Sequence, residues 1–344
     1  MSVSNTGTLS PPHRIYRAGT GVRQKLNALG ATIIHRPPFC SGTLAVEPEE
    51  LVLFYGRTTK DGEEVTGRLD FARTSDDDLQ RLAGVCDAAT FGLGQRDVLD
   101  LSYRSASKLD KEFFAPKLDV NRVGLIDLIR HSLLEGKEGN RGVVAELYKL
   151  NVYGKGSFFK AHKDTPRGES MFGSLVIVLP SEHEGGELVL RHEGQEWMFD
   201  SAKEIKVVKG PSIGFVAFFS DVEHEVKMVT SGYRVTLTYN LFFTDPGSSF
   251  VISRLSGSPP NAALGVAGSF KSTLATLLAD TAFLPDGGYL GFGMRHEYPI
   301  NTATKPEPGV DSLARLGEML KGSDAAVAES CRSLGLKVTL NVVH

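Results

Sequence analysis

The central part of the chain contains the sequence Tyr153-Gly154-Lys155-Gly156-Ser157-Phe158-Phe159-Lys160-Ala161-His162-Lys163-Asp164. It lies within residues 144–243, where short apolar or alternating runs are separated by Gly, Pro or charged turns. The runs cover residues 145–153, 172–180, 187–191, 204–208, 213–219, 222–229 and 233–243. About eight short strands in about a hundred residues are typical of a sandwich or jelly roll and not of a parallel sheet. We therefore predict a mainly β protein with flanking helices (α+β), whose core is a double-stranded β-helix or jelly roll.

Three potential metal ligands occur in and after this stretch. On an extended segment residues two apart share a face, so His162 and Asp164 point into one cavity while Lys163 points away. His224 comes shortly after the apolar run 213–219 and therefore arrives from a distant strand. Two imidazoles and one carboxylate are the ligands of the facial triad that leaves open positions on a non-haem Fe(II). We therefore predict His162, Asp164 and His224 as metal ligands and catalytic residues.

An arginine, Arg234, follows ten positions after His224, within the same strand-rich region. Arg234 lies in the strand-like run 233–239. Its guanidinium is always charged and fork-shaped, which suits bidentate capture of a co-substrate carboxylate. A buried arginine without a carboxylate partner is also costly. Together with the three ligands, Arg234 indicates a site for iron, a dicarboxylate and molecular oxygen.

These residues resemble the Fe(II)/2-oxoglutarate-dependent dioxygenases, in particular the prolyl 4-hydroxylase-like branch. The quoted stretch is similar to that branch's signature Tyr-Gly-x-Gly-x-aromatic-aromatic-x-x-His-x-Asp. Further matches are Gly185-Gly186-Glu187-Leu188, Ser220-Asp221-Val222-Glu223-His224-Glu225-Val226 and Ser231-Gly232-Tyr233-Arg234, so the resemblance covers roughly residues 145–243. Outside it, residues 89–94 and 288–293 resemble fungal stand-alone members of the family.

The resemblance implies specific ligands and roles. Fe(II) would be held by His162, Asp164 and His224, and Arg234 would hold the C5 carboxylate of the co-substrate 2-oxoglutarate. O2 would be consumed, succinate and CO2 released, and an unactivated C–H oxidised, with ascorbate as a supporting reductant. Tyr153 is either a core aromatic or a residue that touches 2-oxoglutarate.

The chain departs from the family at one position. Some relatives place a Tyr in the strand after His-x-Asp to support the co-substrate carboxylate, whereas this chain has the apolar run 175–179. A different hydroxyl would have to help, and we name Thr236 and Ser220 as the two possibilities. Thr236 is the one that we include among the co-substrate-binding residues, beside Arg234 and Tyr153.

Composition predicts an ordinary soluble globular enzyme. The chain has 344 residues, of which 41% are hydrophobic and 23% charged, and its mean hydropathy is −0.10. A net charge of −3 and a pI of about 6.3 predict no general attraction to nucleic acid or anionic membranes. No apolar run reaches the length of a membrane span. The three cysteines are odd in number and far apart, which favours a reducing, cytoplasmic location.

The organisation along the chain suggests a core with cover on either side. We predict a flexible leader over residues 1–22, an N-terminal helical and β cover over 23–143, the jelly-roll catalytic core over 144–245, and a C-terminal α/β cover over 246–344. The last of these is a possible substrate-side subdomain. Helices are predicted from Thr74-Ser75-Asp76 onward and over residues 119–135, 269–279 and 310–320, and a strand over 336–343. The segment 165–172 is either a lid or a surface loop.

The remaining histidines lack a ligand-like spacing. We expect ordinary roles for His13, His35, His131, His183, His192 and His344. Arg295 and His296 follow a Gly-rich stretch, where a structural role is favoured over recognition of a substrate carboxylate.

The sequence is compatible with two classes of substrate. The first hypothesis is a small molecule, either a free amino acid or a natural-product intermediate of secondary metabolism, that undergoes hydroxylation, desaturation or ring closure. The alternative is a prolyl residue in a polypeptide. A non-catalytic jelly-roll binding module would have lost part of the triad or Arg234, and a cupin-type oxygen enzyme without 2-oxoglutarate would not need Arg234. The sequence leaves the oligomeric state open.

Overall fold

The computed structural model describes residues 20–33, 35–58, 62–93, 96–134, 141–168, 170–244, 266–298 and 316–341. The chain divides into two compact units. The larger unit comprises His35–Ser258 and Gly293–His344, and the smaller unit comprises Met1–Ile34 and Pro259–Phe292. None of the described helices is long and apolar enough to cross a membrane.

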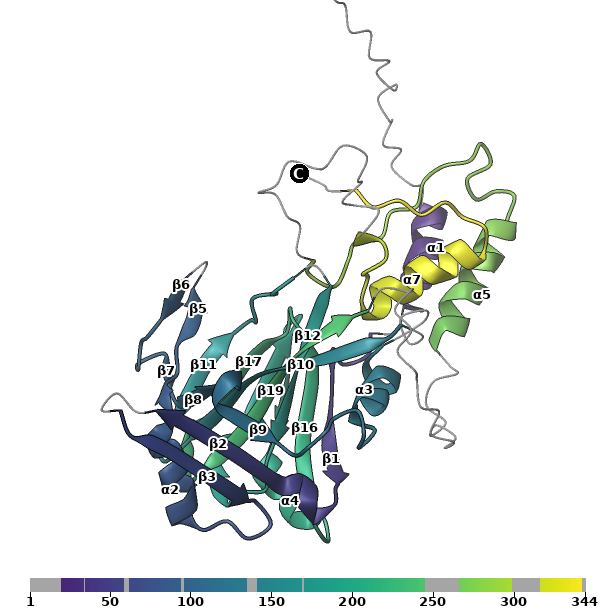
Figure 1. Cartoon of the computed structure of the whole chain (residues 1–344). Helices are drawn as coiled ribbons and strands as arrows, with labels where there is room; N and C mark the ends of the chain where they lie inside the picture. The colour runs from purple at the N-terminus through teal and green to yellow at the C-terminus, as the bar shows by residue number, and fades with distance from the viewer. Residues whose placement is uncertain are drawn as a thin grey trace, which may run out of the picture. The chain divides into compact units, whose positions relative to one another are not determined.

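The larger unit is built on a seven-stranded antiparallel sheet (Figure 1). Its strands, in spatial order, are β1 (Phe39–Ala45), β16 (Ser212–Phe219), β12 (Met171–Val178), β19 (Arg234–Phe243), β10 (Val143–Tyr153), β8 (Ser107–Asp110) and β4 (Asp87–Ala88). On β12 and β19 the side chains alternate between two faces. Leu175, Ile177 and Leu237 join the main apolar core, while Ser174, Thr236 and their strand neighbours on the other face line a cavity.

A second, five-stranded antiparallel sheet contributes the other wall of that cavity. Its order is β15 (Gln195–Phe199), β14 (Leu188–His192), β17 (Glu223–Val226), β11 (Phe158–His162) and β7 (Arg104–Ser105). A short pair, β13 (His183–Gly185) and β18 (Val229–Gly232), lies in the same part of the chain. Two antiparallel sheets around one cavity confirm the predicted fold class, a mainly β jelly roll with flanking helices.

The N-terminal part of the larger unit adds a three-stranded sheet and helices. The sheet has the order β3 (Glu64–Asp70), β2 (Val52–Thr58) and β9 (Phe114–Pro116), and a separate hairpin joins β5 (Phe91–Leu93) to β6 (Arg96–Val98). Short 3-10 turns cover Pro48–Leu51 and Lys111–Phe113. Helix α4 (Ser201–Val207) contacts β16, as does α3 (Leu125–Leu133).

Two of the predicted helices occur here. Helix α2 (Asp76–Val85) begins where predicted, because Ser75 and Asp78 form a reciprocal capping box at its start. The helix predicted over residues 119–135 is shorter and starts only at Leu125. The preceding residues form a turn, in which the Asp119 carboxylate accepts from the backbone N–H of Asn121 and Gly124 adopts a left-handed φ of 74°.

The C-terminal residues of the larger unit contain α7 (Gly322–Ser333). The strand predicted over residues 336–343 is wrong for its described part, since residues 336–341 pair with no strand. Val338 and Leu340 instead pack against the cluster that contains Leu320. The alternation of apolar residues in this segment therefore reflects side-chain packing, and not the hydrogen bonds of a sheet. Most of the helix predicted over 310–320 lies outside the described residues.

In the smaller unit, α1 (Thr20–Gly30) contacts α5 (Val266–Ala279), and Lys25 forms an ion pair with Asp280. Helix α5 confirms the helix predicted from Ser269 and begins three residues earlier. Residues 1–19 of the predicted leader lie outside the described residues, and α1 already includes its last three positions.

Candidate active site

The three predicted metal ligands come together at the ends of two paired strands. His162 is the last residue of β11 and lies directly opposite His224 of β17 in the antiparallel register. Asp164 follows two residues later, and its Oδ1 lies 3.7 Å from Nε2 of His224. One nitrogen from each histidine and one oxygen from Asp164 all lie within 4.8 Å of one another. The structure therefore brings together the three residues that the sequence selected.

Hydrogen bonds fix the orientation of each ligand. Nδ1 of His162 lies 2.8 Å from the carbonyl of Lys160, and Nδ1 of His224 lies 3.2 Å from the carbonyl of Val222. An imidazole that donates from Nδ1 keeps the lone pair of Nε2 available to a metal. Oδ2 of Asp164 accepts a 2.5 Å hydrogen bond from the Ser174 hydroxyl. This donor set fits a divalent metal with open coordination positions.

The surroundings of the histidines favour their neutral forms. The ring of Phe159 stacks on His162 at a centroid distance of 3.6 Å, and Phe218 lies 4.6 Å from the ring of His224. Burial, followed by the neighbouring His224, lowers the pKa of His162 to about 3. A neutral imidazole is the form that binds a metal.

Arg234 lies in the same cavity and forms no ion pair with a described residue. It is the first residue of β19, opposite Tyr153 of β10, and only 1% of its surface is exposed. Its Nε has no hydrogen-bond partner, and no described residue forms an ion pair with the guanidinium, whose Cζ lies 5.6 Å from the Tyr153 ring centroid. Burial lowers the pKa of Arg234. A buried cation in this state calls for an anionic ligand.

A glycine pair makes room for the Arg234 side chain. Gly185 and Gly186 have φ values of 71° and 73°, in the left-handed region that favours glycine. A Cβ atom on Gly186 would lie 2.8 Å from Cδ of Arg234 and 2.9 Å from Cγ2 of Val229. The Gly-Gly sequence therefore allows the arginine stem to pass close to the backbone.

Two hydroxyls accompany Arg234 in the cavity. Tyr153 and Thr236 are 4% and 1% exposed, and both line the cavity. Within the described part of the chain neither hydroxyl has a hydrogen-bond partner. Ser220, the other hydroxyl considered from the sequence, does not line the cavity, because it turns away and donates to the carbonyl of Phe172.

The cavity has a volume of about 770 Å³, which lies in the range of small-molecule sites. Besides the predicted residues, its walls include Arg104, Lys149, Asn151 and Arg167, which the sequence did not single out. Lys149 and Asn151 share the inward face of β10 with Tyr153. The period-two alternation from Tyr153 was the signal that could have identified both.

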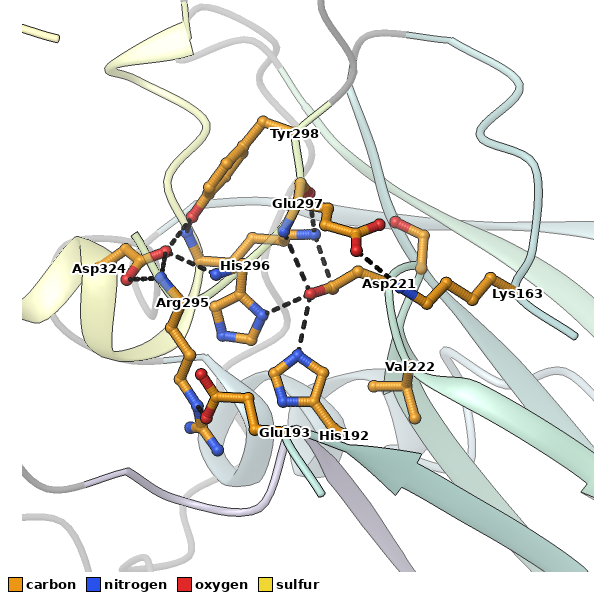
Figure 2. Close-up of polar contacts among 12 residues, drawn as sticks. Lys163, His192, Glu193, Asp221, Val222, Arg295, His296, Glu297, Tyr298 and Asp324 are labelled. Atoms are coloured by element: carbon orange, nitrogen blue, oxygen red, sulfur yellow. Dashed lines mark hydrogen bonds and ion pairs between the residues drawn. The ribbon is translucent and has the colours of Figure 1, made fainter. Parts of the chain in front are cut away.

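A second polar cluster surrounds Asp221, three residues before His224 (Figure 2). Its Oδ2 accepts hydrogen bonds from Nε2 of His192 at 3.1 Å and Nδ1 of His296 at 3.0 Å, and from the backbone N–H of Glu297 at 3.2 Å. Its Oδ1 lies 3.0 Å from Nζ of Lys321. Burial raises the pKa of Asp221, but the two histidine hydrogen bonds and the Lys321 ammonium hold that pKa far below its usual range.

The Asp221 cluster has the donor set of a metal site but not its charge balance. Donor atoms of His192, Asp221 and His296 also lie within 4.8 Å of one another. However, the buried ammonium of Lys321 already neutralises the carboxylate, and a divalent cation beside it would meet a like charge at low dielectric. The cluster is therefore a buried ion pair that attaches the C-terminal residues to the loop before His224.

The same C-terminal residues reach the first ligand segment. Glu297 forms a 2.6 Å ion pair with Lys163, the residue between His162 and Asp164 (Figure 2). Arg295 donates to Glu193 and to the carbonyl of Arg36. Arg295 and His296 thus have the structural role that the sequence favoured, although their partners were not foreseen.

The chain is similar to solved structures at low sequence identity. A prolyl-4-hydroxylase from Pseudomonas putida is 15% identical with a TM-score of 0.36, and the match covers 64% of this chain and 100% of that one. A prolyl hydroxylase from Trichoplax adhaerens, in complex with a hypoxia inducible factor peptide fragment, is 16% identical with a TM-score of 0.36, covering 66% and 94%. AviO1 from Streptomyces viridochromogenes Tue57 is 17% identical with a TM-score of 0.33, covering 65% and 96%. No curated protein matches the chain.

A family model gives the assignment. Residues 148–242 match the model of the 2OG-Fe(II) oxygenase superfamily. The matched segment runs from β10 to β19 and includes His162, Asp164, His224 and Arg234. The resemblance of this segment to Fe(II)/2-oxoglutarate-dependent dioxygenases is thereby confirmed. The segment that carries the site thus matches the 2OG-Fe(II) oxygenase superfamily, and the chain is an oxidoreductase that uses Fe(II), 2-oxoglutarate and O2.

Proposed function

We propose that His162, Asp164 and His224 hold the Fe(II), that Arg234 binds the C5 carboxylate of 2-oxoglutarate, and that the enzyme oxidises an unactivated C–H of a small molecule. The observation that carries this proposal is the buried, unpaired guanidinium of Arg234 in the same cavity as the three ligands. A guanidinium in this position gains a bidentate, charge-assisted pair only when a carboxylate enters the cavity.

Each residue of the site has a distinct task. The Ser174 hydroxyl and the two backbone carbonyls orient the three ligands. The hydroxyls of Tyr153 and Thr236 complete the recognition of the co-substrate carboxylate beside Arg234. When bound, iron and 2-oxoglutarate supply an O2-dependent oxidation that releases succinate and CO2. Apolar cavity residues such as Leu188, Phe218 and Val226 exclude water from it.

The polar lining of the cavity supports a small molecule as the substrate. Lys149, Asn151 and Asn240 are all less than 10% exposed and still line the cavity. Buried polar groups of this kind fix the orientation of a small ligand and provide specificity for it. An amino acid or a natural-product intermediate has matching charged and polar ends, and the alternative of a prolyl residue in a polypeptide is tested directly below.

The test is succinate formation from 2-oxoglutarate by Fe(II)-loaded protein in air, with and without ascorbate. Free L-amino acids and a proline-rich peptide are supplied in parallel. We expect an amino acid to stimulate turnover, whereas stimulation by the peptide alone would establish the polypeptide reading. Asp164→Ala and His162→Ala should abolish iron-dependent turnover while the circular dichroism spectrum is retained. Near-full activity in either variant would show that the site is assigned wrongly.

A further inference from the structure

A second buried cation lies in the active-site cavity. Lys149 is 9% exposed and lines the cavity. Among the described residues it has no hydrogen-bond or ion-pair partner, and its one described contact is with the ring of Tyr148, 4.5 Å from Nζ. The register of β10 against β19 shifts between Leu147 and Lys149, so a bulge brings Tyr148 and Lys149 to the cavity together. An ammonium buried without a partner is costly unless an anion joins it.

The wall around Lys149 is electropositive. The Arg167 guanidinium lies over the same Tyr148 ring, with Cζ 4.3 Å from the centroid, and donates to the Tyr148 hydroxyl. Arg104 is 7% exposed and donates only to the carbonyl of Thr90 and the side chain of Asn151. No described carboxylate pairs with these three cations, although the chain as a whole carries a net charge of −3.

Carboxylates in the cavity do not compensate for these charges. The acidic residues along its described lining are Asp164, a proposed iron ligand, and Asp100. Asp100 is exposed and accepts hydrogen bonds from Ser102. The cavity therefore attracts anions beyond the one expected at Arg234.

Lys149 and Arg234 lie at separate positions along the cavity wall. Arg234 lies opposite Tyr153, four residues from Lys149 on β10, so the two backbone positions are about 13 Å apart. The five-carbon chain of 2-oxoglutarate spans no more than about two residues of extended backbone. A 2-oxoglutarate molecule that places its C5 carboxylate at Arg234 uses its other end at the metal, so Lys149 is left for a second anion.

Lys149 also lies on the metal side of the cavity. It is opposite Thr238 of β19, which is opposite Val176 of β12. Val176 is two residues from Ser174, whose hydroxyl binds Asp164. Lys149 is thus two strand spacings, about 10 Å, from the strand that supports the ligand, within reach of a bound substrate that touches the metal centre.

We propose that the substrate is a carboxylate-bearing small molecule whose carboxylate pairs with Lys149. This inference rests on the proposed function, in which Arg234 is reserved for 2-oxoglutarate. The compact ammonium supplies up to three donors, and the neighbouring Asn240 amide, buried and without a hydrogen-bond partner among the described residues, adds a neutral donor. A single carboxylate can accept from both.

The test is thermal unfolding of the anaerobic Fe(II)- and 2-oxoglutarate-loaded protein with a panel of carboxylates. The probes are the twenty L-amino acids, their carboxamides, and monocarboxylates of two to ten carbons, with inorganic phosphate as a separate arm. At a hundredfold excess over its dissociation constant, we expect at least one carboxylate to raise Tm by about 5 °C, and the matching carboxamide not to do so. Lys149→Met should lose this rise and Lys149→Arg should keep part of it.

Each outcome bears on one of the two proposals. If no carboxylate raises Tm, if the rise persists in Lys149→Met, or if phosphate acts where carboxylates do not, the Lys149 assignment is overturned. Lys149→Met should keep the stabilisation by 2-oxoglutarate itself, whereas Arg234→Met should lose it. If 2-oxoglutarate still stabilised both variants, Arg234 would not bind it, and the proposed function would be contradicted. Without added anion, Lys149→Met should unfold at the wild-type Tm or above it, because an unpaired buried charge has been removed.

Discussion

Arg234 carries a full positive charge on a side chain that is 1% exposed and forms no ion pair with a described residue. Replacing it with Met removes the charge and keeps most of the stem. We expect the apparent KM for 2-oxoglutarate to rise at least about 30-fold, since truncating one partner of a buried charge pair costs about 2–5 kcal/mol. The apparent KM of Arg234→Lys should lie between those of Arg234→Met and the wild type. An unchanged KM in succinate assays would remove Arg234 from the co-substrate site.

A substitution at Gly186 tests whether this glycine positions the Arg234 side chain. A Cβ at Gly186 would lie 2.8 Å from Cδ of Arg234, at a φ of 73°. Gly186→Ala should therefore lose stability, by about 1–2 kcal/mol from the left-handed backbone alone, and should also weaken 2-oxoglutarate binding by displacing the arginine.

Gly194→Ala is the matched control for this effect. Gly194 has a φ of 75°, but a Cβ there would have no atom within 4 Å. It should show the loss of stability in urea unfolding without any change in the KM for 2-oxoglutarate. Equal KM values in Gly186→Ala and Gly194→Ala would mean that close approach to Arg234 is unimportant.

At the scale of strands, the sequence predicted which side chains share a face, because this depends only on local alternation. His162 and Asp164 share a face because they are two residues apart on an extended segment, and this holds whatever strand lies beside them. The direct pairing of His162 with His224 was not predictable, because it depends on the register between β11 and β17. Tyr148 was missed for a related reason. The bulge beside Lys149 brings Tyr148 to the cavity against the alternation of β10, and no residue type there indicates a bulge.

The attachment of the C-terminal residues depends on partners that local sequence cannot reveal. Asp221 meets His192, His296 and Lys321 at separations of 29, 75 and 100 residues. We expect Asp221→Asn to lower the free energy of unfolding by about 3–5 kcal/mol, because Lys321 is left buried without its counter-charge. The double variant Asp221→Asn/Lys321→Met should recover part of that loss in urea unfolding. Simple addition of the two single effects would show that the residues are not coupled.

At the scale of the molecule, two His-Asp-His groups within the described residues compete as metal sites. The Lys321 ammonium 3.0 Å from Asp221 already balances the second group, so we expect one iron per chain and not two. Elemental analysis of Fe(II)-reconstituted protein should give a ratio near one. That ratio should fall towards zero in His162→Ala and stay unchanged in His296→Ala. Loss of metal from His296→Ala in a folded protein would reverse this assignment.

The pH dependence of global stability also reports on buried histidines. Burial lowers the pKa of His183 to about 4, whereas the unfolded chain has a value near 6.5. The unfolded state therefore binds more protons between these values, so stability is complete above about pH 6.5 and falls as the pH decreases towards 4. We expect this residue to contribute a loss of about 2 kcal/mol between pH 7.5 and 5 in the metal-free protein.

His183→Gln isolates that contribution. Nδ1 of His183 lies 2.8 Å from the carbonyl of Ser181, a contact that a Gln amide can keep, while its Nε2 is buried without a partner. Urea unfolding at pH 7.5, 6 and 5 should show a shallower decline in this variant, with part of the decline remaining because burial also lowers the pKa of His162. His131→Gln, an exposed position on α3, should retain the wild-type decline. If His183→Gln declined as steeply as the wild type, protonation of another group would have to limit stability in acid.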